Sequence, residues 1–498
     1  MVTRSQRRYG TPLATYRLQL TPEFGFAEAL DVVPYLEKLG VSHLYLSPFF
    51  EAAPGSTHGY DVVNHNQVRR AFGGLSGLYE LGEGLASRDM GLIADFVPNH
   101  VGIGTANPWW IDVLRYGRES PYAAYFDIDW EAQPQMTSGM LRYPVLGQSF
   151  GRALEAGELR LALIDHDLVV TYYDYHLPLS PHSYSRVLGI PPIALRDRLG
   201  DPAALAKLVE TIDGLRQASR DEADPMLTTF RSLLAGEPPL AAWAEETVER
   251  LNGSNGDPAS FDALEAVLLE QPYRLTDWRV SGEEINYRRF FDNNDLAGIR
   301  VERDDVFEDI HRLLFELVAG GIVTGVRIDH VDGLYDPGSY LARLRQRLDE
   351  ITSGLEGSVV PIYVEKILER SEQLPSWAMD GTTGYNFLGE VEGLFVDRTA
   401  AGPMTAAYRD FTGVRQRFDD VVYDSKLHIA ATAFAGEMNV LAWQLYRIAE
   451  RHRLYRDITL RAFRRAITGV MACFPVYRTY LADDPGDAAG VIDRANAD

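Results

Sequence analysis

Hydrophobic and polar positions follow two alternating rhythms along the first hundred residues of the chain. Short apolar runs of strand length alternate with longer stretches in which apolar residues recur at helical spacing. Strands are predicted at residues 14–20, 42–48 and 92–98, and helices at residues 26–40 and 77–91. The first helical stretch ends on Gly40, a typical helix stop. Three strand–helix steps in this order are typical of a parallel sheet with right-handed crossovers.

This rhythm is interrupted over residues 101–300 and resumes afterwards. The interrupting segment is irregular and rich in Pro, Trp, Tyr and Asp, with helical patches at 203–217 and 260–271. The later elements are a helix at 305–321, a strand at 322–329, a helix at 339–351 and a strand at 359–367. The simplest interpretation is a β/α barrel that carries a large insertion after its third strand.

The segment from residue 386 onwards is mostly helical in pattern, with amphipathic stretches at 427–452 and 458–474. We therefore expect four segments: a first barrel part (1–100), a mixed and helical insertion (101–300), a continued barrel (301–385) and a helical region (386–498).

Composition excludes several classes of protein. The chain of 498 residues has 48 basic and 71 acidic residues, and its net charge of −23 disfavours a nucleic-acid binder. It contains no apolar run of about 18 residues that would span a membrane, and its start lacks the apolar core of a secretory signal. Cys473 is its single cysteine, which excludes an internal disulfide framework. These features predict a cytoplasmic protein.

Polar and titratable residues follow four of the predicted strands. In a β/α barrel the carboxyl ends of the strands meet at one rim, where active sites are built. Candidates after the second and third strands are His58, Tyr60, Asp61, Asp95, Asn99 and His100. Candidates at the next two strands are Arg327, Asp329, His330, Asp332, Glu365 and Lys366.

Two of the carboxylates have the pattern of a pair that cleaves a glycosidic bond. Arg327 and Asp329 alternate onto one face of their strand, so the guanidinium is expected to lower the pKa of Asp329 and keep it ionised. Glu365, on the neighbouring strand, is expected in a drier place with a raised pKa. Retaining cleavage needs carboxyl groups about 5 Å apart, and adjacent strands lie about 4.8 Å apart. His58, His100 and His330 are candidates for hydrogen bonds to sugar hydroxyls.

Other catalytic motifs are missing from the sequence. It has no dinucleotide-binding or phosphate-binding glycine loop, no H-E-x-x-H and no G-x-S-x-G. A metal site built from Asp95, His100 and Asp329 is conceivable, but the positive charge of Arg327 disfavours it.

Three of these segments resemble signature regions of the α-amylase superfamily of glycoside hydrolases and transglycosidases: DFVPNH (95–100), GVRIDHVDG (325–333) and YVEKIL (363–368). GSTHGYDVV (55–63), INYRRFFDNNDLAGIRVE (285–302) and GTTGYNF (381–387) resemble the maltooligosyltrehalose synthase family in particular. The resemblance runs from about residue 14 to about residue 480.

The resemblance implies a (β/α)8 barrel and an isomerase reaction of trehalose biosynthesis. In that reaction the reducing-end α-1,4 linkage of a maltooligosaccharide becomes an α,α-1,1 linkage by intramolecular transglucosylation. It implies Asp329 as the nucleophile, Glu365 as the general acid/base, and no metal or organic cofactor. The implied sugar contacts are Tyr60, His100 and Arg327. We add as hypotheses the contacts of His58, Asp61 and Tyr385 with the freed glucose, and those of Asp95, Asn99, His330 and Lys366.

The sequence departs from this family at its end. The family's fourth signature supplies a third acidic residue in a segment that follows a stretch like VYRTYL (476–481). That segment is not found here, so the third acid and the last two barrel strands are expected to be missing. Asp483, Asp484 and Asp487 have no such context. Three alternatives therefore stay open: an α-1,4-glucan hydrolase or 4-α-glucanotransferase, an inactive glucan-binding remnant, and a chain completed by a separately encoded C-terminal fragment.

Overall fold

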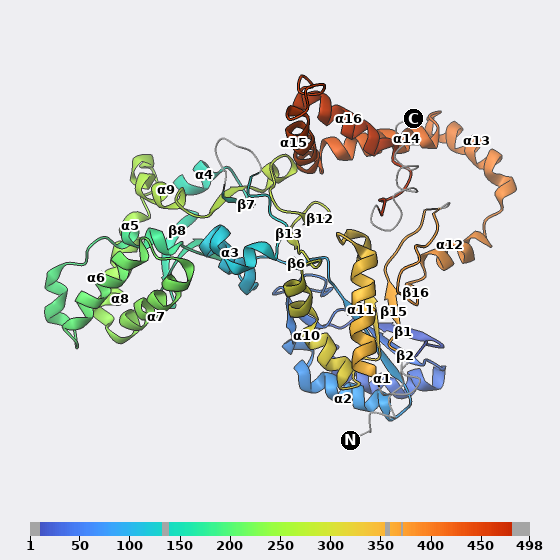
Figure 1. The fold of residues 1–498 in the computed structure, drawn as a ribbon, viewed down its shortest axis with the longest axis horizontal. Helices are drawn as coiled ribbons and strands as arrows, with labels where there is room; N and C mark the ends of the chain where they lie inside the picture. The colour runs from blue at the N-terminus through green and yellow to red at the C-terminus, as the bar shows by residue number, and fades with distance from the viewer. Residues whose placement is uncertain (1–9, 132–138, 354–358, 370–371, 481–498) are drawn as a thin grey trace. The chain divides into compact units, whose positions relative to one another are not determined.

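Six short parallel strands form the sheet that carries most of the candidate site residues. The structure is a computed structural model that describes residues 10–131, 139–353, 359–369 and 372–480. The chain divides into two compact units: Met1–Val101 with Ile299–Asp498 (unit 1), and Gly102–Gly298 (unit 2). The sheet belongs to unit 1 (Figure 1).

The sheet has the strand order β1-β2-β5-β14-β15-β16, and every neighbouring pair is parallel. Its strands are β1 (Thr15–Leu18), β2 (His43–Leu46), β5 (Gly91–Phe96), β14 (Gly325–Ile328), β15 (Ile362–Val364) and β16 (Gly381–Thr382). This order, with each strand laid beside its predecessor, is that of a barrel wall. The predicted β/α-barrel class is confirmed, with six strands of the wall in the part of the chain that the structure describes.

Helices connect most of these strands and cover the sheet. They are α1 (Phe26–Leu39), α2 (Gly74–Ala86), α10 (Asp304–Ala319) and α11 (Pro337–Thr352). In α1 the buried residues Phe26, Ala29, Val33 and Leu36 form one stripe at helical spacing. Gly40 ends this helix in the left-handed conformation with φ of 88°, as its position in the sequence predicts.

The structure differs from the predicted elements at two places in unit 1. An antiparallel pair, β3 (Phe50–Ala52) and β4 (Val62–Val68), lies between β2 and α2 and was not predicted. The amphipathic stretch 427–452 is not one helix, because the backbone leaves the helical conformation at Thr432. It therefore forms α14 (Phe418–Ala431) and α15 (Ala435–Glu450).

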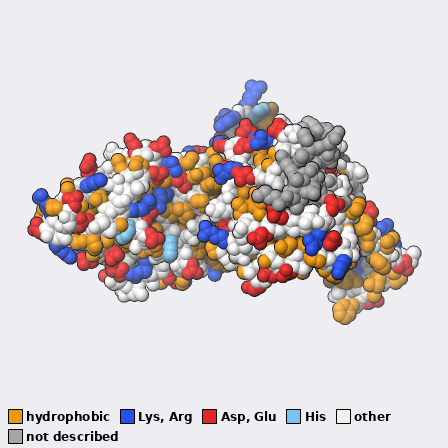
Figure 2. All heavy atoms as spheres, turned by 90° about the horizontal axis from the view of Figure 1, so that it is seen from below, with side chains coloured by type: hydrophobic (Ala, Val, Ile, Leu, Met, Phe, Trp, Pro, Cys, Tyr) orange, Lys and Arg blue, Asp and Glu red, His pale blue; other side chains and the backbone are white. Residues whose placement is uncertain are grey.

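The C-terminal helices of unit 1 bury little apolar surface. α15 packs on α16 (Leu460–Cys473) through a small core of Ala442, Ala449 and Phe463. By contrast, α12 (Tyr385–Gly393), α13 (Ala401–Thr412) and α14 hold no buried residue. Phe411 of α13 is 92% exposed. Figure 2 shows hydrophobic side chains gathered at the right-hand end of the view, where α13 lies.

Unit 2 combines helices with small sheets. The strand β7 (Leu141–Leu146) pairs in parallel with β11 (Tyr273–Asp277). A meander contains β8 (Leu159–Ile164), β9 (Asp167–Tyr172) and β10 (Tyr175–Pro178). Asp165 and His166 form the β8–β9 turn at φ of 50° and 60°, the left-handed pair that a two-residue hairpin requires.

The helices of unit 2 pack on one another and on the meander. They include α6 (Ala203–Leu215), α7 (Arg220–Gly236), α8 (Pro238–Leu251) and α9 (Asp262–Leu268), of which α6 and α9 fall within the two predicted helical patches. Across both units, none of the helices in the described residues is long and apolar enough to cross a membrane.

Candidate active site

Four charged side chains meet at the carboxyl end of three adjacent strands. Asp95 lies in β5 and Arg327 in β14, where the parallel register places the two residues side by side. Asp329 directly follows β14, and its backbone N–H donates to the carbonyl oxygen of Phe96 at 2.8 Å. Glu365 directly follows β15, and its N–H donates to Ile328 at 2.9 Å. The hydrogen bonding of the sheet therefore continues through Asp329 and Glu365. It fixes their backbone positions, and with them the points from which their side chains extend.

Arg327 contacts all three carboxyl groups. Its Nη1 atom lies 2.6 Å from Asp95 Oδ1 and 2.6 Å from Asp329 Oδ1, and its Nη2 atom lies 3.3 Å from Glu365 Oε2. The prediction that Arg327 and Asp329 share one face of the strand is confirmed by this contact. The shared guanidinium holds Asp329 and Glu365 at one end of the sheet.

Two tyrosines complete the surroundings of Asp95. The hydroxyl groups of Tyr60 and Tyr45 donate to Asp95 Oδ2 at 2.7 and 2.8 Å. Arg17 Nη2 donates to the Tyr60 hydroxyl at 3.4 Å, and the Arg327 guanidinium lies 5.7 Å from the centre of the Tyr60 ring. Sequence reasoning found Tyr60 but missed Arg17 and Tyr45. A signal was present, since each is a polar residue inside a predicted strand.

Burial dominates the electrostatics of this cluster. It raises the pKa of Asp329 to about 7; the charge of Arg327 acts in the opposite direction, and Asp95 and Glu365 add to the increase. Burial also raises the pKa of Asp95, against the effect of Arg327 and the two tyrosine hydrogen bonds. Burial alone would lower the pKa of Arg327, but Asp95 and Asp329 raise it above its ordinary value. One guanidinium faces three carboxyl groups, so the cluster favours retention of a proton.

The prediction that Glu365 is more buried than Asp329 is wrong. The side chain of Asp329 is 8% exposed and that of Glu365 is 24% exposed, so Asp329 occupies the drier place. The pKa of Asp329 is raised and not lowered, because Arg327 divides its charge among three carboxyl groups while burial acts on Asp329 in full.

His330 contributes to the site through its backbone. Its φ of 44° lies in the left-handed region, which is uncommon outside glycine. In this conformation its N–H donates to Glu365 Oε2 at 2.9 Å. Asn99 and His100 are both almost fully buried, with Asn99 Nδ2 lying 3.3 Å from His100 Nδ1.

The other predicted sugar contacts, His58, Asp61 and Tyr385, come from the loop between β3 and β4 and from α12. The His58 ring stacks on Tyr60 with ring centres 6.1 Å apart, and its Nδ1 accepts from the Tyr60 N–H at 3.0 Å. Asp61 accepts a hydrogen bond from the Ser56 hydroxyl. Tyr385 is the first residue of α12, and within the described residues no hydrogen bond or ion pair joins it to the carboxylates.

Lys366 belongs to a separate polar cluster. Its side chain is 0% exposed, and its Nζ atom lies 3.1 Å from Asp332 Oδ2 and 2.9 Å from Glu372 Oε1. Asp483, Asp484 and Asp487 lie outside the described residues. Among the residues that the structure describes, no three His, Cys, Asp or Glu side chains are grouped so that they could hold a metal ion.

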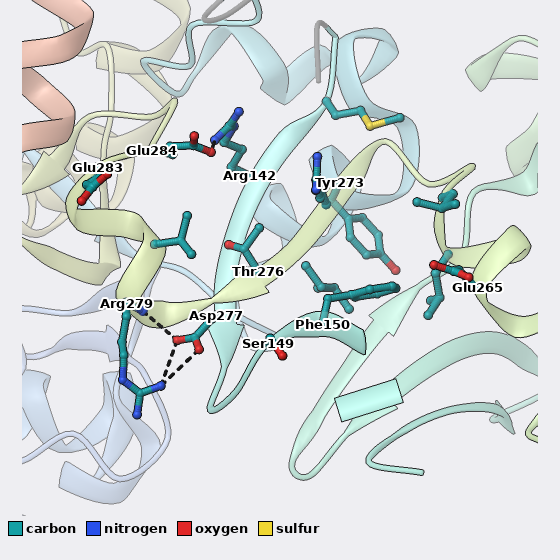
Figure 3. A pocket seen from close by; sticks show the side chains of 16 residues that line it. Arg142, Ser149, Phe150, Glu265, Tyr273, Thr276, Asp277, Arg279, Glu283 and Glu284 are labelled. Atoms are coloured by element: carbon teal, nitrogen blue, oxygen red, sulfur yellow. Dashed lines mark hydrogen bonds and ion pairs between the residues drawn. The ribbon is translucent and has the colours of Figure 1, made fainter. Parts of the chain in front are cut away.

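Unit 2 contains a cavity of about 780 Å³ along β7 and β11 (Figure 3). Arg142 pairs with Glu284 on its wall, and Asp277 accepts from Arg279 at 3.1 Å. None of the predicted site residues lines this cavity.

Comparisons with known proteins agree on one group of relatives. The α-amylase catalytic-domain model matches residues 25–153. A putative maltooligosyl trehalose synthase from Mycobacterium tuberculosis is 35% identical over 437 residues, which cover 86% of this chain and 44% of that protein.

Two solved structures agree with this relationship. Maltooligosyltrehalose synthase from Arthrobacter ramosus matches with a TM-score of 0.71 at 34% identity, over 98% of this chain and 50% of that one. A hypothetical maltooligosyl trehalose synthase from Sulfolobus tokodaii matches with a TM-score of 0.68 at 28% identity, over 98% and 51% of the two chains. The chain spans about half the length of the relatives it matches. The resemblance seen in the motifs is confirmed: over nearly its whole length the chain is similar to maltooligosyltrehalose synthases, and residues 25–153 match the α-amylase catalytic-domain model.

Proposed function

We propose that this chain carries the carboxylate pair of an intramolecular transglucosylase that forms an α,α-1,1 linkage at the reducing end of a maltooligosaccharide. The observation that carries the proposal is the shared contact of Arg327 with Asp329 and Glu365 at the ends of adjacent parallel strands. The names of the relatives support this choice of reaction within the superfamily.

The proposed reaction is a double displacement by the form of the cluster in which Asp329 is ionised and Glu365 carries the proton. In that form Asp329 attacks the anomeric carbon of the penultimate sugar, and Glu365 gives its proton to the departing glycosidic oxygen. The freed glucose then turns in the site, and Glu365 takes the proton of its anomeric hydroxyl as that oxygen displaces Asp329. Two bonds break and two form, so the product has the length of the substrate.

The polar residues around the pair are proposed to hold the sugars. Tyr60, His100 and Arg327 are assigned to the sugar that becomes covalently bound, with Asp95, Asn99 and His330 beside them. His58, Asp61 and Tyr385 are assigned to the freed glucose. This glucose must stay enclosed, because water at the same position would give hydrolysis instead.

Product analysis on maltopentaose tests the proposal. A non-reducing product of unchanged length is expected, and Asp329→Asn and Glu365→Gln should each abolish its formation. Asp213→Asn, a change at an exposed ion pair of unit 2, is the matched control that should retain activity. Shorter sugars as the main products would favour the hydrolase or glucanotransferase alternative, and undiminished turnover by Asp329→Asn would refute the nucleophile assignment.

A polypeptide partner is also proposed, since α12, α13 and α14 bury no residue and the relatives are about twice as long as this chain. A C-terminal fragment would cover these helices and supply the third acidic residue that the resemblance implies. Addition of the second half of the Arthrobacter ramosus protein should raise turnover and yield a one-to-one complex. If the chain binds maltopentaose without turnover under both conditions, the glucan-binding remnant is the better description.

A cytoplasmic location is proposed because the chain has a single cysteine and so cannot form an internal disulfide framework. Fractionation of the source cells tests it.

A further inference from the structure

A buried lysine lies directly beside the proposed acid/base. Lys366 follows Glu365 in the chain, and its ammonium group is enclosed between Asp332 Oδ2 at 3.1 Å and Glu372 Oε1 at 2.9 Å. The Lys366 side chain has no exposed surface. Two of the three ammonium N–H groups thus have carboxylate partners inside the protein, so the group is not presented to a sugar.

Asp332 connects this lysine to the loop that carries the proposed nucleophile. It lies in the 3₁₀ turn η9 (Val331–Gly333), three residues after Asp329. Its carboxylate also accepts from the Tyr480 hydroxyl. Arg478 Nη1 donates to the backbone carbonyls of Asp332 and Leu334 at 2.8 and 2.6 Å. Lys366 and the segment that contains Arg478 and Tyr480 therefore both hold this turn.

The loops after β14 and β15 are joined at two points. One is the hydrogen bond from the His330 N–H to Glu365 Oε2 at 2.9 Å. The other is the ion pair of Lys366 with Asp332 at 3.1 Å. Since Glu365 and Lys366 are neighbours, as are His330 and the η9 turn, a shift of one loop against the other changes where the Glu365 carboxyl group lies relative to Asp329.

We propose that Lys366 and Asp332 are positioning residues, which set the place of Glu365 relative to Asp329, and that Lys366 does not bind substrate. This inference rests on the proposed function, because it assigns the pair a task in proton donation by Glu365. It replaces the sequence-based expectation that Lys366 contacts the sugar.

Two substrates with different leaving groups distinguish a positioning role of Lys366 and Asp332 from general damage to the site. With a maltooligosaccharide, the C1–O bond breaks as the Asp329–C1 bond forms, and the Glu365 proton passes to the departing oxygen. With α-maltotriosyl fluoride, the C1–F bond breaks as the Asp329–C1 bond forms, and fluoride leaves as an anion with little need of that proton. The first fluoride released per chain reports this step alone, before an acceptor hydroxyl displaces Asp329 with Glu365 as the base. A displaced Glu365 therefore slows the first reaction far more than the second.

The experiment compares Asp332→Asn with Glu372→Gln, each of which removes one of the two charges facing Lys366. Asp332→Asn is expected to lower kcat on maltopentaose by about 10- to 100-fold, as misplacement near a reacting centre does, and to change the rate of the first fluoride release per chain less than about threefold. Glu372→Gln leaves the link between the two loops intact, so its ratio of the two rates should match that of the unaltered chain. Equal losses on both substrates with Asp332→Asn, or a raised KM with kcat unchanged, would overturn the positioning role.

Lysine acetylation followed by mass spectrometry supplies a readout that needs no activity. The chain has four lysines, and Lys38, Lys207 and Lys426 are exposed. They should react readily while Lys366 stays protected, and Asp332→Asn should increase the reaction of Lys366. Reaction of Lys366 at the rate of the other three overturns the inference. If Lys366 is protected but the unaltered chain, with the second half of the Arthrobacter ramosus protein added, turns over neither substrate, the proposed function fails, and the positioning role fails with it.

Discussion

Two helices of unit 1 have similar lengths but differ completely in how many of their residues are buried. α10, with 16 residues, buries nine of them, including Phe307, Ile310 and Leu314, in its packing on β4 and α11. α14, with 14 residues, buries none, although it carries Phe418, Val421 and Ile429. Both start with acidic residues in the first turn. Both segments form helices, but only α10 gathers its apolar residues on one strong face, and the two helices differ in burial as well as in pattern.

This difference shows what an amphipathic pattern encodes. The apolar face predicts that something covers the helix, but it does not say where the covering residues lie in the sequence. For α10 these residues lie in β4 and α11, whereas the apolar side chains of α14 are not buried by any part of the chain that the structure describes. Exposed apolar side chains that occur singly are normal on a protein surface, so exposure alone does not identify a partner.

Truncation of one phenylalanine in each region should give the largest contrast. Phe96 of β5 is 0% exposed and contacts the rings of Phe50, His65 and His311. Phe96→Ala should lower the free energy of unfolding by about 3–5 kcal/mol, from lost burial and the cavity left behind. Phe411→Ala, at the exposed face of α13, should change it by less than about 0.5 kcal/mol. Denaturant titration measures both, and similar losses would mean that α13 is packed in solution.

The charged end of the sheet should give a smaller effect that depends on pH. Asp329 has a pKa raised to about 7 in the folded protein, against about 3.9 in an unfolded chain. Its contribution to stability is present below about pH 4 and is lost as the pH rises through 7, because folding favours the protonated form. Asp329→Asn should therefore stabilise the chain at pH 8, on the order of 1–3 kcal/mol, and much less at pH 4. Thermal melts at both pH values measure this, and a variant less stable at pH 8 than the unaltered chain would contradict it.

The smallest effect on stability is expected from Phe411→Ser. A polar group on a surface that is already exposed should leave the melting temperature almost unchanged. It should reduce self-association, because it removes part of the apolar surface of α13. Light scattering at increasing concentration tests this, with Tyr35→Ser on α1, another exposed aromatic, as the control. Equal changes in the two variants would argue against a sticky surface on α13.

The sequence predicted the elements whose pattern is local. The stripe of α1, its stop at Gly40 and the alternation of Arg327 with Asp329 all depend on neighbouring residues, and all are found. The β3–β4 pair was missed because its two strands are joined by an irregular loop of nine residues (53–61) that includes GSTHGYD, and this loop carries no short hairpin signal. The relative solvent exposure of Asp329 and Glu365 was predicted wrongly. It depends on how three carboxyl groups, on strands far apart in the sequence, surround one guanidinium.

The left-handed backbone at His330 separates two properties of a single residue. The hydrogen bond to Glu365 comes from the main chain, so for this bond the identity of the side chain matters only through the conformation it permits. Asn or Gly can adopt this conformation readily, whereas a β-branched residue resists it. Replacement by Asn therefore removes the imidazole and retains the amide contact, while replacement by Val opposes the turn itself. At position 330 the site therefore requires a particular backbone conformation. A search for reactive side chains would not detect this requirement.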